Sequence, residues 1–116
     1  MGKTNLKPGL TINFREGCVS IGKDVIRALK EPKFISIMKN DEKKTLLIIP
    51  CGEYDPLSFR VPNNLLSDHN KVLRIYSLQF INELKEAGGF AGVNYVRLHG
   101  SYDEEMGSVI FRFGED

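Results

Sequence analysis

The 116-residue chain has few of the residues that would place it in several large protein classes. Its two cysteines, Cys18 and Cys51, form no CxxC pair and are too few for a disulfide scaffold. No apolar run approaches the roughly 20 residues of a membrane span, and the first residues show neither a signal-peptide core nor a myristoylation pattern. We therefore expect a cytoplasmic protein with reduced thiols that does not contact a membrane.

Motifs of catalytic and metal sites are equally scarce. His69 and His99 form no HxxxH or HExxH pattern, so the sequence does not predict a zinc site. The glycines of 87–92 match neither GxxxxGK[ST] nor GxGxxG, and the acidic run 103–105 lacks the spacing of a calcium loop. Neither cysteine has the local sequence of a catalytic nucleophile, and we expect buried structural thiols. The sequence predicts no enzyme, cofactor or metal, and shows no evident small-molecule substrate.

Net charge is close to balanced at +1, but its distribution along the chain is uneven. Residues 1–50 contain ten Lys and Arg against five Asp and Glu, whereas residues 51–116 contain six against ten. The first half could therefore present an anion-binding face and the second an acidic one. The alternative is that both are ordinary solvated surface.

Hydrophobic periodicity predicts a β-rich α+β fold in which one order of elements occurs twice. In the first half, alternation and turn residues indicate strands at 10–14, 19–21, 34–38 and 46–49, with a short helix over 23–30 that Pro32 ends. In the second half they indicate strands at 59–61, 72–75, 95–98 and 109–113, with a helix over 78–87 that Ser77 caps and Gly88-Gly89 ends.

The apolar helix positions keep a constant separation between the two halves. Ile26 corresponds to Ile81 and Leu29 to Leu84, both 55 residues apart. We infer an internal duplication within a single domain 1–116: a first unit at 10–50, a connector at 51–57 and a second unit at 58–113. One unit is too small to bury a core alone, so both should share one core across an approximate twofold. The predicted core includes Ile21, Val25, Ile26, Leu29, Ile48, Ile81, Leu84 and Phe111.

The run Gly17-Cys18-Val19-Ser20-Ile21-Gly22, the helix after it and the hairpin ending at Pro50 resemble the AbrB/SpoVT-type swapped-hairpin domain. The resemblance is clear over 10–50 and loose over 58–113. It implies a pseudo-twofold, swapped-hairpin-like barrel in which one chain supplies both halves. The family contains bacterial transcription regulators and antitoxins that bind DNA through basic residues. Two positions depart from its pattern: Cys18 stands in place of an arginine and Gly22 in place of a proline.

The resemblance and the charge of the first half together suggest a non-enzymatic DNA-binding regulator. Lys23 and Arg27 are four residues apart, so both should project from the solvent side of their helix. We predict that duplex phosphates are contacted by a basic set comprising Arg15, Lys23, Arg27, Lys30, Lys33, Arg60, Lys71 and Arg74. The alternative is a protein-interaction or structural module of the same fold without DNA binding, which Cys18 and the acidic second half favour. A homodimer or another protein partner stays open.

Overall fold

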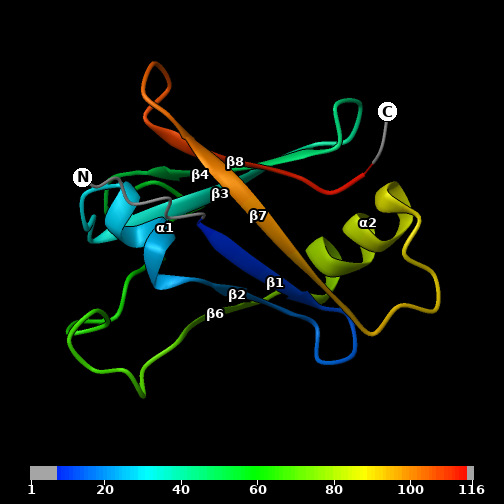
Figure 1. Ribbon diagram of the computed structural model, residues 1–116, viewed down its shortest axis with the longest axis horizontal. Coiled ribbons are helices and arrows are strands. Elements are labelled where there is room, and N and C mark those ends of the chain that lie inside the picture. The colour runs from blue at the N-terminus through cyan, green and yellow to red at the C-terminus, as the bar shows by residue number, and fades with distance from the viewer. Residues whose placement is uncertain (1–7, 115–116) are drawn as a thin grey trace, which may run out of the picture.

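The computed structural model describes residues 8–114, which form eight strands and two helices (Figure 1). The first half contains β1 (Gly9–Asn13), β2 (Cys18–Ile21), α1 (Lys23–Ala28), β3 (Phe34–Asn40) and β4 (Thr45–Pro50). The second half contains β5 (Phe59–Arg60), β6 (Leu73–Tyr76), α2 (Leu78–Gly88), β7 (Tyr95–Asp103) and β8 (Ser108–Arg112). The β-rich α+β class predicted from periodicity is confirmed.

All eight strands belong to one antiparallel sheet in the order β5-β3-β4-β8-β7-β1-β2-β6. The sheet curves into a nearly closed barrel, and α1 (cyan) and α2 (yellow) lie at opposite ends of the molecule (Figure 1). Within residues 8–114, β5 and β6 are the two strands with a neighbour on one side only. Among the described residues, the barrel is open between β5 and β6, and also along β3 beyond Ile35, where β5 no longer pairs with it.

The two halves of the chain are joined by strand pairing rather than by contact between separate sheets. Four pairs connect a strand of the first half with one of the second: β1 with β7, β2 with β6, β3 with β5 and β4 with β8. Every strand therefore bonds to a strand of the other half, and the continuous sheet depends on both halves.

A single cluster of buried apolar side chains fills the barrel. It contains all eight predicted core residues, including the α2 side chains Ile81 and Leu84, which are 1% and 0% exposed. Burying a side chain of this size contributes about 1.5–3 kcal/mol. The signals at the ends of α2 are also confirmed, because Ser77 Oγ accepts the Phe80 N–H at 3.2 Å and Gly89 ends the helix with φ 69°.

Some boundaries differ from those expected. α1 ends at Ala28, two residues before the predicted Lys30, because Lys30 and Glu31 both adopt positive φ, at 65° and 56°. The segment ahead of Pro32 therefore leaves the helical conformation early. No helix among residues 8–114 is long and apolar enough to cross a membrane.

Candidate nucleic-acid interface

The predicted basic residues do not gather on one surface. Lys71 belongs to the segment 61–72 that connects β5 to β6, and Lys23, Lys33 and Arg60 lie next to that segment. Others stand apart from that segment: Arg15 in the turn between β1 and β2, Arg27 and Lys30 at the end of α1, and Arg74 on β6.

Two lysines of the set donate hydrogen bonds to backbone carbonyl groups of the connecting segment. Lys23 Nζ donates to the Asp68 carbonyl oxygen at 2.8 Å, and Lys71 Nζ donates to the Asn63 carbonyl oxygen at 2.8 Å. The prediction that Lys23 projects into solvent is therefore wrong, because its ammonium group lies against the connecting segment. An irregular segment leaves carbonyl groups without ladder partners, and these ammonium groups satisfy two of them. Replacing either lysine would therefore disturb the connecting segment, whether or not that lysine also contacts a ligand.

Arg27 is exposed as expected, but it is not a free cation. Its Nη1 lies 3.0 Å from Asp24 Oδ1, one turn earlier on α1. An exposed pair of this kind contributes little to stability, yet it neutralises the charge that a phosphate would meet. The face of α1 therefore attracts anions less than the sequence suggested.

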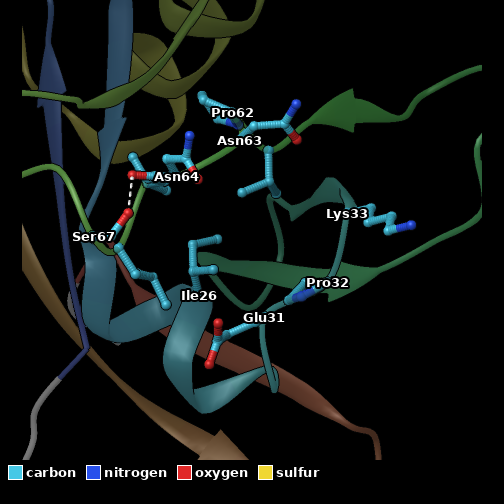
Figure 2. A pocket seen from close by; sticks show the side chains of 11 residues that line it. Ile26, Glu31, Pro32, Lys33, Pro62, Asn63, Asn64 and Ser67 are labelled. Carbon is cyan, nitrogen blue, oxygen red and sulfur yellow. Dashed lines mark hydrogen bonds between the residues drawn. The ribbon is translucent and has the colours of Figure 1, made fainter.

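A pocket of about 300 Å³ separates the end of α1 from the segment 61–72 (Figure 2). Ile26, Leu65 and Val61 supply apolar walls, and Ser67 Oγ donates to the Asn64 carbonyl oxygen at 3.3 Å. Figure 2 shows the Lys33 side chain pointing away from the other lining residues.

The charged residues that line the pockets beside the segment 61–72 have both signs. Glu31 lines the pocket of Figure 2, and Glu53 lines a smaller neighbouring pocket together with Lys33 and Arg60. These carboxylates offset the lysines and arginine around them. The pockets near the segment 61–72 therefore lack the uniform positive charge that a phosphate backbone requires.

The outer face of the strands β7, β1, β2 and β6 has a different character. Strand register places its side chains in two rows that each cross all four strands. The first row is Arg97, Thr11, Ser20 and Arg74, and the second is Tyr95, Asn13, Cys18 and Tyr76. We call this surface the Arg–Tyr face.

Large side chains flank the Arg–Tyr face and small ones occupy its centre. Tyr95 is 67% exposed and Tyr76 is 64% exposed, and both arginines are exposed. The two arginines are three strand spacings apart, roughly 14 Å along the sheet. A Cβ placed on Gly9 would lie 3.4 Å from Nη2 of Arg97, so that guanidinium extends over the glycine backbone.

Negative charge is almost absent from the Arg–Tyr face. Strands β1, β2 and β6 contain no Asp or Glu, and Asp103 at the far end of β7 is the only one in that strand. Arg15 in the adjoining turn adds a cation next to Glu16. The face gathers Arg15 and Arg74 from the predicted set and adds Arg97, which the sequence reasoning missed. Arg97 stands between Val96 and Leu98, which pack against the core. This alternation of apolar and charged residues indicates that Arg97 lies on the outer face of the strand.

The cysteine thiols are kept in their protonated form. Burial, followed by the charge of Glu16, raises the pKa of Cys18, while Arg74 acts in the opposite direction. Burial also raises the pKa of Cys51, with a further contribution from Asp55. A thiol above its ordinary pKa is a weak nucleophile at neutral pH. Among residues 8–114, no group of three or more His, Cys, Asp or Glu side chains could hold a metal ion.

Comparison with known proteins identifies no relative from which a role for these residues could be transferred. Scans against protein-family models, curated proteins and solved structures each return no match to the chain.

Proposed function

We propose that this chain is a non-enzymatic DNA-binding transcriptional regulator of the AbrB/SpoVT-like swapped-hairpin type, with both units fused in one polypeptide. The observation that carries the DNA-binding role is the Arg–Tyr face. It combines exposed arginines on both flanking strands with a floor of small side chains and almost no carboxylates. Phosphate contacts supply most non-specific DNA affinity, and a basic surface with few carboxylates provides them.

Support for the duplication comes from the two β-hairpins. Asn40 pairs with Thr45 across one four-residue turn, and Asp103 pairs with Ser108 across the other. The last turn residue has positive φ in both, 52° at Lys44 and 62° at Gly107.

A side chain starts each of these turns in the same way. Asn40 Oδ1 accepts the Lys43 N–H at 3.0 Å, and Asp103 Oδ1 accepts the Met106 N–H at 3.3 Å. Equal turn length, matching positive φ and the same side-chain acceptor are what two copies of one ancestral unit would retain. The proposal is also supported by the pairing of β1 with β7 and of β5 with β3, since each joins the first strand of one half to the third strand of the other.

The test is a titration of labelled random duplex DNA at about 50 and 200 mM salt. We expect binding that weakens steeply with salt. The double variant Arg74→Glu/Arg97→Glu should bind much more weakly, and its log–log salt slope should fall by about two, one for each lost phosphate contact.

The matched control is Lys43→Glu/Lys85→Glu, which changes net charge by the same amount on a hairpin turn and on α2. Its affinity for duplex should stay close to that of the parent. Equal losses in both double variants would mean that net charge, not the Arg–Tyr face, governs binding. A parent chain that binds no duplex at about 50 mM salt, where phosphate contacts are strongest, would refute the proposed function.

A further inference from the structure

The open side of the barrel contains a largely apolar groove. The groove has a volume of about 430 Å³ and lies between β5 and β6, with Phe59 and Ile75 on its two sides. Ile37 and Phe80 also line it. Leu57, at its mouth, is 64% exposed, and Phe59 is 36% exposed.

Unpaired edges of β5, of β6 and of the second half of β3 border this groove, because β5 pairs only with Phe34 and Ile35 of β3. β5 pairs with β3 alone and β6 pairs with β2 alone, so the edge that each strand turns toward the other has no strand partner within residues 8–114. The corresponding strands of the first half, β1 and β2, are joined by a short turn and pair directly. In the second half, the longer segment 61–72 separates the strands. An edge of free N–H and C=O groups is a template for an added strand.

Side-chain alternation on these edges defines what an added strand must carry. On β5, Phe59 faces the groove and Arg60 is exposed. On β6, Ile75 faces the groove and its neighbour Arg74 is exposed. A strand between them would place alternate side chains against Phe59 and Ile75 and the others between the two arginines. Its inward residues must therefore be apolar and its outward residues negatively charged.

The charged groups around the groove are consistent with that requirement. Lys39 also lines it, but its ammonium is paired with Asp41 Oδ1 at 2.7 Å and Glu83 Oε1 at 3.4 Å. Arg60 and Glu53 line the same small pocket, but they do not form an ion pair. Arg74 also forms no ion pair within residues 8–114. The cations available to a bound segment are thus the two that project from the strand edges.

We propose that the groove between β5 and β6, which we call the seam, binds an extended peptide segment of a partner protein. In this segment, apolar residues alternate with Asp or Glu. The segment pairs with a free strand edge through its backbone and completes the barrel. This inference does not depend on DNA binding, because the seam and the centre of the Arg–Tyr face are different surfaces.

The probe is a labelled seven-residue peptide, acetyl-TVEVEVT-amide, titrated with the full chain and followed by fluorescence anisotropy. We expect saturable micromolar binding. A peptide with lysine in place of each glutamate should bind at least tenfold more weakly, about 1.4 kcal/mol. Alternate N–H groups of a strand point to opposite edges, so two N-methylated peptides are needed, one modified at the valines and one at the glutamates. At least one of them should lose binding, because its methyl groups block the edge that forms the backbone ladder.

Charge reversal at the seam distinguishes this site from others. Arg60→Glu should weaken binding of the acidic peptide about tenfold and allow the lysine peptide to bind. Arg97→Glu, the matched control on β7, should leave both peptides unchanged. Arg60 is exposed, so the variant should keep the parent's circular dichroism spectrum.

Three results would overturn the proposal. One is the absence of saturable binding by the acidic peptide. Another is undiminished binding of both N-methylated peptides, which would exclude pairing through either edge of the added strand. The third is a concentration-dependent dimer in sedimentation experiments that Phe59→Ser abolishes, because the seam would then be occupied by a second copy of the chain.

Discussion

Replacing Gly22 by alanine should destabilise the protein although its backbone conformation permits any residue. Gly22 has φ −68° and ψ 148°, and alanine there would gain about 0.4–1 kcal/mol from a less flexible unfolded chain. A Cβ on Gly22, however, would lie 2.6 Å from the Gly9 carbonyl oxygen, which also accepts the Gly22 N–H at 2.8 Å. Both partners are backbone, so β1 and the start of α1 must separate, at a cost of about 1–3 kcal/mol.

The expected net loss is therefore between about 0 and 2.6 kcal/mol in the free energy of unfolding, measured by urea denaturation followed by circular dichroism. Gly52→Ala is the matched control, because a Cβ there has no neighbour within 4 Å and should be neutral or slightly stabilising. If both variants have the same midpoint and slope, the close approach of Gly9 and Gly22 does not constrain the fold. A proline at position 22 would fit the φ of −68° but would remove the N–H that bonds to the Gly9 carbonyl oxygen.

Three further measurements test the packing and the electrostatics. Lys39→Met should lower the free energy of unfolding by about 1 kcal/mol at pH 7. The Asp41 hydrogen bond chiefly raises the pKa of Lys39, so this difference should persist up to the unfolded lysine pKa, near 10.4, and vanish as pH rises through the higher folded value. Leu84→Ala, at a fully buried position, should cost about 2–5 kcal/mol in urea denaturation. A thiol reagent should label half-buried Cys51 faster than buried Cys18 in the folded protein and both equally in urea.

The elements with strong local signals were predictable from the sequence. α2 has a serine cap, an apolar stripe through Ile81 and Leu84, and a glycine stop, and it begins and ends within a residue of the predicted bounds. The positions of the strands were also apparent, because alternation of apolar and polar residues reflects one buried face. Strand pairing was harder to derive, since it depends on which edges meet after the chain has turned several times.

The candidate site was less predictable because it depends on contacts between distant segments. Nothing in the sequence near Lys23 indicates that its ammonium bonds the carbonyl oxygen of Asp68, 45 residues later. Arg97 and Arg74 lie on one face only because β1 and β2 stand between their strands in a particular register. A one-residue slip in either pair would have moved an arginine to the other face of the sheet.

Because Arg74 borders both the Arg–Tyr face and the seam, the two proposed ligands should compete. An acidic segment bound along β6 would place its carboxylates beside Arg74 and reduce the positive charge available to a phosphate. Saturating acetyl-TVEVEVT-amide should therefore weaken duplex binding about 3- to 10-fold, and duplex should weaken peptide binding by the same factor, since coupling between two sites is reciprocal. Arg74→Gln should weaken both interactions and abolish the coupling, whereas Arg27→Gln should leave the coupling unchanged. Duplex affinity that is the same with and without saturating peptide would show that Arg74 serves at most one of the two surfaces.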